Sequence, residues 1–120
     1  MKILAAALAL PALALAADLE ALTRAEMPSL LALYQELHAN PELSLHEVET
    51  AARIASELRA AGFDVTEKVG GQGLVGVLKN GNGPVIMVRT DLDALPVKEQ
   101  TGLPYASTRT VKDEQGREVH

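Results

Sequence analysis

Apolar residues in the first half of the chain follow the spacing of two helices. The first helix has one apolar face, made by Leu30, Leu33, Tyr34 and Leu37. Pro28 is suited to the first turn of this helix, because the backbone N–H groups of that turn are unbonded in any helix. Pro41 disfavours helical backbone at the residue before it, so we expect the helix to end in "HANPEL".

A second helical pattern follows at once. Ser44 and Glu47 have the spacing of a capping box, in which two side chains bond free backbone N–H groups at the start of a helix. One side of this second helix is apolar, with Val48, Ala51, Ala52, Ala55 and Leu58. Gly62 is expected to end it, since glycine accepts the left-handed conformation that often follows a helix.

After Gly62 the pattern changes to that of extended strands. "FDVTEKV" (63–69) alternates, and "LVGVLK" (74–79) forms a second strand after the loop "GGQG". "PVIMVRT" (84–90) is almost continuously apolar, which is typical of a strand covered on both faces. The intervening "NGNG" (80–83) predicts a hairpin turn. The order helix, helix, strand, strand, strand predicts an α/β domain with a mixed sheet.

The two ends of the chain carry different signals. Residues 1–16 combine Lys2, an Ala/Leu run and a small-x-small end, which is typical of a secretory signal peptide; an ordinary N-terminal helix or a weak anchor is the alternative. We therefore expect export, to the periplasm, with residues 17–27 as a lead-in and no membrane span after cleavage. "STRTV", "KDEQG" and "REVH" predict a further hairpin that is cut short at residue 120. A fragment of a larger protein explains this better than a short protein with a loose tail.

Composition narrows the chemistry. The formal net charge is −5 and no basic stripe is present, which argues against a nucleic-acid partner. The chain has no cysteine, so it cannot build a thiolate metal site by itself.

Asp91 and Asp93 are the first candidates for chemistry. They follow the apolar stretch 84–90 and lie two residues apart, so in an extended chain both carboxylates point to the same side. Such a pair can ligate a hard cation or orient a histidine that does. It can equally be a pair of solvated loop aspartates before Pro96.

A phosphotransferase is a weaker alternative for this pair. Haloacid-dehalogenase-like enzymes carry Asp-x-Asp after a hydrophobic strand, with the first aspartate as nucleophile. Here Arg89 and Thr90 intervene, and the fourth position after Asp91 is Leu95 rather than threonine or valine.

The three histidines and the glycines complete no catalytic set. His46 opens "HEVET", but the zinc-binding helix motif needs a second histidine where Thr50 stands, so we expect a residue of the first helical turn. His38 lies near a helix C-terminus, where the dipole favours imidazolium; a structural role is favoured over ligand binding. His120 is the last residue and marks no site. The glycines of 70–73 precede no helix, so they form no phosphate loop.

Three stretches taken together carry a family resemblance: "LHANPELSLHEVETAARIASELRAAGFDV", "GLVGVLKNGNGPVIMVRTDLDALPV" and "TGLPYAS". They closely resemble the N-terminal part of the zinc-dependent amidohydrolases, aminoacylase-like metallopeptidases that include hippurate hydrolase and indole-acetyl-amino-acid hydrolase. The resemblance covers roughly residues 28–119. It implies that residues 28–120 are an incomplete N-terminal portion of a zinc-exopeptidase-like, mixed-sheet catalytic domain.

The family implies an activity and its cofactors. Its members release an acyl group from the nitrogen of an amino acid or short peptide, using two divalent metal ions, zinc or manganese, and a glutamate as general base. A smaller dimerisation domain interrupts the catalytic domain, so a homodimer is implied for the full length. By this resemblance Asp93 orients a metal-binding histidine and Asp91 lines the site, and neither is expected to bind metal directly.

The chain departs from the family at its end. It stops before the Cys-Gly-His-Asp segment that supplies metal ligands, and it lacks the Glu-Glu segment with the general base. We therefore expect the 120-residue chain alone to be inactive and to bind no metal tightly. A non-catalytic exported remnant or binding domain is the second hypothesis.

Overall fold

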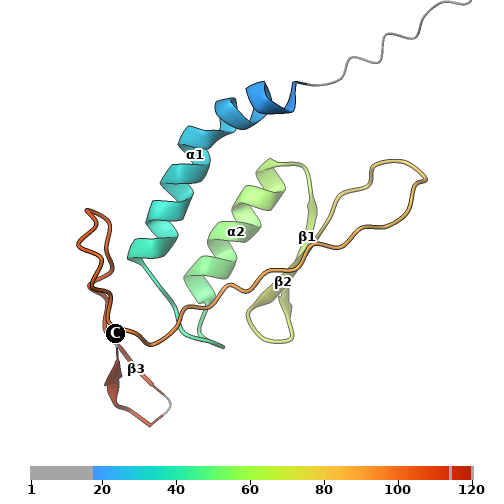
Figure 1. Cartoon of the computed structure of the whole chain (residues 1–120). Coiled ribbons are helices and arrows are strands. Elements are labelled where there is room, and N and C mark those ends of the chain that lie inside the picture. The colour runs from blue at the N-terminus through green and yellow to red at the C-terminus, as the bar shows by residue number, and fades with distance from the viewer. Residues whose placement is uncertain (1–17, 114, 120) are drawn as a thin grey trace, which may run out of the picture.

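A computed structural model describes residues 18–113 and 115–119. Two helices, α1 (Leu19–Ala39) and α2 (Val48–Ala60), precede a hairpin of β1 (Asp64–Val69) and β2 (Gly73–Val77). A second small hairpin, β3 (Val111–Lys112) and β4 (Glu118–Val119), follows a long stretch without helix or strand (Figure 1). The predicted α/β class is confirmed. The predicted signal peptide, residues 1–16, lies outside the described residues.

Helix α1 begins nine residues before Pro28, so the prediction that Pro28 starts the helix is wrong. Asp18 caps the helix instead, because its carboxylate accepts hydrogen bonds from the backbone N–H groups of Glu20 and Ala21, both at 3.1 Å. Pro28 therefore sits inside the helix, where it removes one backbone hydrogen bond. The helix ends at Ala39, as the proline at position 41 predicted.

Helix α2 starts without the predicted capping box. Its N-cap residue, Glu47, makes no side-chain capping bond, and Leu45 has a positive φ of 70° that turns the chain before the helix. The C-terminal end follows the prediction. Gly62 has φ of 88°, and the N–H groups of Gly62 and Phe63 donate to carbonyls of the last turn, as in a Schellman motif.

Strands β1 and β2 pair antiparallel, which confirms two predicted strands and the loop between them. The register pairs Asp64 with Val77, and a bulge near Lys68 interrupts the ladder before the turn. Helix α2 lies beside this hairpin in Figure 1 and contacts both of its strands. We call α2, β1 and β2 the helix–hairpin unit.

The core of the described chain lies within the helix–hairpin unit. Ala51 and Ala55 are buried on α2, and Ala55 is 0% exposed. Gly76 of β2 lies so near Leu58 and Phe63 that a β-carbon there would meet each at 3.2 Å. Small residues therefore let the helix and the hairpin approach closely.

The prediction of a third strand at residues 84–90 is wrong. This stretch forms no strand, and the predicted hairpin at 80–83 does not close. The four side chains of Val85–Val88 are between 84% and 98% exposed. A strand needs a hydrogen-bonded neighbour, and residues 18–113 and 115–119 offer none beside this stretch. The apolar pattern indicates that residues 84–90 can form a strand. It does not indicate whether a neighbouring strand is present to pair with them.

The remaining pairings are small. The predicted terminal hairpin is confirmed in reduced form, since β3 and β4 pair antiparallel over two residues each. One isolated parallel bridge joins Leu43 to Ala94. No helix in the described part of the chain has the length and apolar character needed to cross a bilayer.

Candidate functional site

Asp91 and Asp93 lie together on the exposed side of the chain. Leu92 and Ala94 between and after them are half-buried, so the alternation predicted from the sequence holds in the structure. The Asp91 carboxylate pairs with Arg89, whose Nη2 lies 2.6 Å from Oδ1. Both partners are exposed, so this ion pair contributes only about 0–1 kcal/mol.

Asp93 has a different environment. Among residues 18–113 and 115–119 its carboxylate makes no hydrogen bond and no ion pair. The next residue, Ala94, is held in place by a backbone hydrogen bond, because its N–H donates to the carbonyl of Glu42 at 2.8 Å. The aspartate segment, residues 91–97, is thus joined to the loop before α2.

Glu42 is the residue that sequence reasoning missed at the start of α2. Its buried carboxylate accepts hydrogen bonds from the N–H of Thr50 at 2.7 Å and from the N–H of Glu49 at 3.2 Å. Burial raises the pKa of Glu42, but these hydrogen bonds, helped by the charge of Arg109, outweigh it and lower the pKa below its ordinary value. A carboxylate held at a helix N-terminus is also favoured by the helix dipole. One residue therefore caps α2 with its side chain and holds the aspartate segment with its carbonyl.

A second contact, besides that of Glu42 with Ala94, joins the end of α1 to the chain after the aspartates. His38, in the last turn of α1, lies with Nε2 2.8 Å from Oε1 of Glu99. The Glu99 carboxylate also accepts hydrogen bonds from the hydroxyl of Thr101 and, at 2.6 Å, from the N–H of Ser107. These bonds, first that of Thr101 and then those of His38 and Ser107, lower the pKa of Glu99 to about 2. Glu99 is therefore a charged acceptor at neutral pH.

Aromatic rings surround His38. The ring centroids of Tyr34 and Tyr105 lie 5.6 Å and 5.2 Å from that of His38, and 5.9 Å from each other. Distances in this range suit edge-to-face aromatic contacts. The histidine thus has the structural role that its position at the helix end predicted, and its main partner lies 61 residues away in the sequence.

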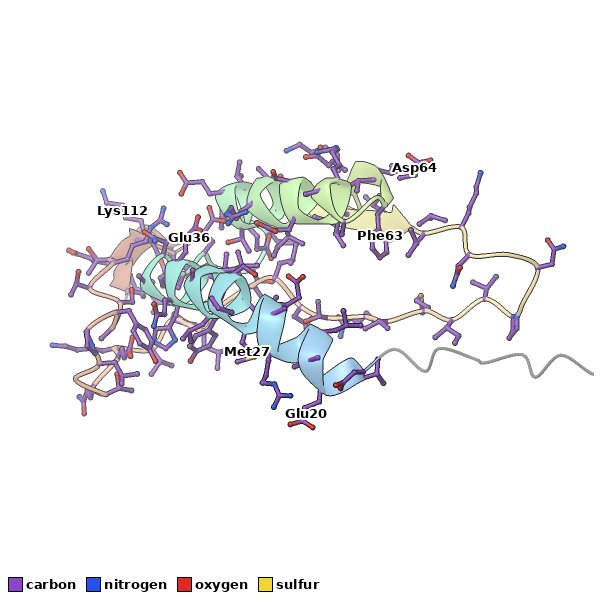
Figure 2. The ribbon with its side chains drawn as sticks, turned by 90° about the horizontal axis from the view of Figure 1, so that it is seen from above. Glu20, Met27, Glu36, Phe63, Asp64 and Lys112 are labelled. Atoms are coloured by element: carbon purple, nitrogen blue, oxygen red, sulfur yellow. The ribbon has the colours of Figure 1, made fainter. Side chains whose placement is uncertain are left out.

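An open cavity of about 350 Å³ lies between the end of α1 and the aspartate segment. Its lining combines apolar and polar side chains: Leu37, His38, Pro41, Ala94, Leu95, Val97, Glu99, Thr101, Ser107 and Arg109. In Figure 2, seen from above, α1 and α2 lie side by side, and Glu36 lies between them. Glu36 pairs with Arg53 of α2 at 3.0 Å. In Figure 1 the extended chain after the hairpin runs back past β1 and β2 and below the lower end of α2.

Among the described residues, His46 supplies no further site residue. His46 lies two residues before α2 and not within its first turn, and it borders a smaller cavity with Glu42, Arg109 and Lys112. His120 lies outside the described residues.

The described residues do not provide the donor set of a two-metal centre. Within residues 18–113 and 115–119, no three histidine, cysteine, aspartate or glutamate side chains gather as metal ligands would. Asp91 and Asp93 alone do not make such a centre, which requires several convergent ligands.

The chain is similar to known hydrolases. It is 40% identical over 106 residues to a probable hydrolase of Synechocystis, a match that covers 86% of this chain and 27% of that protein. It is 47% identical over 75 residues to the hippurate hydrolase of Campylobacter jejuni, covering 62% of this chain and 20% of the relative. It is 40% identical over 80 residues to the N-acetylcysteine deacetylase of Bacillus subtilis, covering 65% and 21%.

The chain therefore spans about a fifth to a quarter of the length of the curated relatives it matches. A match over 86% of 120 residues necessarily includes residues 20–100, and with them His38, Asp91, Asp93 and Glu99. No family model matches the chain. No solved structure matches it either. The resemblance stated from the sequence is confirmed: over the matched residues this chain is a homologue of amidohydrolase-type hydrolases.

Proposed function

We propose that this chain is part of a metal-dependent amidohydrolase that releases an acyl group from the nitrogen of an amino acid or short peptide. The observation that carries the proposal is the similarity over most of the chain to hydrolases named hippurate hydrolase and N-acetylcysteine deacetylase. Those names share a small amide substrate. The comparisons support neither the phosphotransferase nor the non-catalytic alternative.

Within such an enzyme, Asp91 lines the site and Asp93 orients a metal-binding histidine that the described residues do not include. The exposure of both carboxylates on one side of the chain supports these roles. The Asp93 carboxylate is not engaged by any described residue, so it is available to accept the N–H of an imidazole. A carboxylate that accepts this N–H fixes the orientation of the ring and raises its basicity as a ligand.

The proposal extends to the complete protein. It would hold two divalent metal ions, zinc or manganese, and form a homodimer, whereas this chain alone would bind no metal tightly and would be inactive. Export to the periplasm, with cleavage after residue 16, is proposed from the pattern of residues 1–16 alone.

The test uses the native protein purified from its source, with its intact mass measured on the same sample. We expect a polypeptide several times larger than 120 residues that hydrolyses N-acyl amino acids when zinc or manganese is supplied. The purified 120-residue chain should show no turnover under the same conditions. A native protein of the relatives' length without any such hydrolysis would refute the proposed activity, and sustained turnover by the short chain would refute its inactivity.

A variant tests the role of Asp93. Asp93→Asn in the active protein should lower kcat/KM about 10- to 100-fold, because an orienting partner of a metal ligand is lost. Asp64→Asn, at an exposed position at the start of β1, is the matched control and should leave kcat/KM unchanged. Equal activity of the two variants would remove Asp93 from the site.

A further inference from the structure

The aspartate segment, residues 91–97, is held by two polar anchors, one at its middle and one just beyond its end. At its middle, the N–H of Ala94 donates to the carbonyl of Glu42 at 2.8 Å. Downstream, Glu99 is held by His38 at 2.8 Å and by the N–H of Ser107 at 2.6 Å. The imidazole of His38 is therefore the contact that joins helix α1 to the chain just after the segment.

Apolar packing contributes little to the placement of the second half of this segment, after the half-buried Leu92 and Ala94. Leu95 and Val97 are 76% and 67% exposed, and the open cavity separates part of the segment from the end of α1. Hydrophobic stabilisation scales with the apolar area removed from water, so these two side chains supply only a small part of their potential. Polar contacts are therefore the main determinant of where residues 95–97 lie.

The His38–Glu99 contact has the properties of a firm anchor. The Glu99 carboxylate uses both oxygens, and its side chain is only 14% exposed. Hydrogen bonds to a charged acceptor contribute more than those between neutral groups. The imidazole in turn is flanked by Tyr34 and Tyr105, which limit its rotation.

We propose that His38 and Glu99 are positioning residues that set the place of Asp91 and Asp93 relative to α1. This inference rests on the proposed function, because the proposed function gives the two aspartates their role at the active site. The pair touches no reacting group itself. It acts through the four residues between Ala94 and Glu99.

The first test measures position without activity. Residue-resolved hydrogen exchange of the 120-residue chain reports on the N–H of Ala94, which lies five residues before Glu99 in the sequence. His38→Ala and Glu99→Ala should each accelerate exchange at Ala94 at least tenfold, and the double variant should add little to either change. His38→Gln should remain near the parent rate, because the glutamine Nε2 can reach the carboxylate in place of the imidazole Nε2.

The matched control is Glu36→Gln on the same helix. It removes the exposed ion pair to Arg53 but leaves His38 in place, so exchange at Ala94 should not change. Amides of α2 should keep their protection in every variant, which separates loss of the anchor from unfolding. Unchanged exchange at Ala94 in both alanine variants would overturn the proposal, as would equal acceleration by His38→Gln and His38→Ala.

A second test separates this inference from the proposed function. In a native hydrolase that is active on N-acyl amino acids, His38→Ala should lower kcat with a smaller effect on KM, and His38→Gln should restore most of kcat. Faster exchange at Ala94 in a protein without hydrolase activity would support the anchor and refute the activity. Full kcat in an active His38→Ala variant would refute the positioning role while leaving the activity in place.

Discussion

The helix–hairpin unit and the stretch from Val85 to Val88 contain similar apolar residues in very different surroundings. In the unit, Ala55 is 0% exposed and Gly76 lies against Leu58 and Phe63. In Val85–Val88, every side chain is at least 84% exposed. The difference shows that apolar sequence forms a core only where a second element lies within reach along the described chain.

The same comparison bears on the candidate site. Asp91 and Asp93 follow directly after the exposed stretch, and polar anchors on Glu42 and Glu99 hold the residues beyond them. The unit that folds on local contacts is thus distinct from the segment that carries the proposed chemistry.

The largest effect is expected in the middle of the helix–hairpin unit. Ala55→Leu should lower the free energy of unfolding by about 1–3 kcal/mol, because three extra carbon atoms enter a fully packed position. Ser56→Leu, at the exposed neighbouring position, is the control and should change it by less than about 0.5 kcal/mol. Urea unfolding followed by circular dichroism measures both. Equal stabilities would mean that α2 does not pack on the hairpin as described.

A somewhat smaller effect is expected at the start of α2. Glu42→Gln should cost about 1–2 kcal/mol, since a charged acceptor of two backbone hydrogen bonds becomes neutral. The folded-state pKa of Glu42 is lowered, so its contribution to stability is present above the ordinary pKa of 4.5 and is lost as the pH falls below it. Urea titrations at several pH values should therefore show parent and variant converging in acid. A constant difference between pH 7 and pH 3 would contradict the assignment.

The N-terminal cap of α1 gives the next effect. Asp18→Ala should cost about 1 kcal/mol of helix stability, because the N–H groups of Glu20 and Ala21 lose their acceptor. Hydrogen exchange of the first turn of α1 measures it, and Asp18→Asn should retain most of the protection. Slow exchange in the alanine variant would show that α1 does not begin at Leu19.

The smallest effect on stability is expected in the exposed stretch. Ile86→Lys should change the free energy of unfolding of the 120-residue chain by less than about 0.5 kcal/mol, because the side chain is 84% exposed. It should also reduce self-association, since a charge protects an unpaired extended segment from edge-to-edge pairing. Urea unfolding and sedimentation velocity supply the two readouts. A loss above 1 kcal/mol would mean that Ile86 is packed.

The sequence predicted those features that depend on local pattern. Apolar spacing located α2 and much of α1, and Gly62 marked the end of α2 through its left-handed conformation. The start of α1 predicted from Pro28 is wrong, because the Asp18 cap stabilises a start nine residues earlier. The spacing of Asp91 and Asp93 after an apolar stretch predicts a site, and their role there stays a prediction.

The contacts that place the aspartates were beyond the sequence pattern. Glu42 reaches the N–H groups of Glu49 and Thr50 only because the chain turns at Leu45, whose positive φ is not encoded by any glycine. The His38–Glu99 contact joins residues 61 positions apart, and no local spacing rule reports such a distance. Strand propensity in residues 84–90 was visible, but the absence of a paired neighbour in the described chain was not.

Residue-resolved hydrogen exchange of the 120-residue chain tests the difference between the two regions most directly. Protection reports hydrogen-bonded backbone that opens rarely, and it needs no assumption about activity. The account predicts clear protection for the amides of Ala55 and Val75 and exchange close to the unstructured rate for those of Ile86 and Val88. Equal protection in the two regions would contradict it, because Val85–Val88 would then have a partner within this chain.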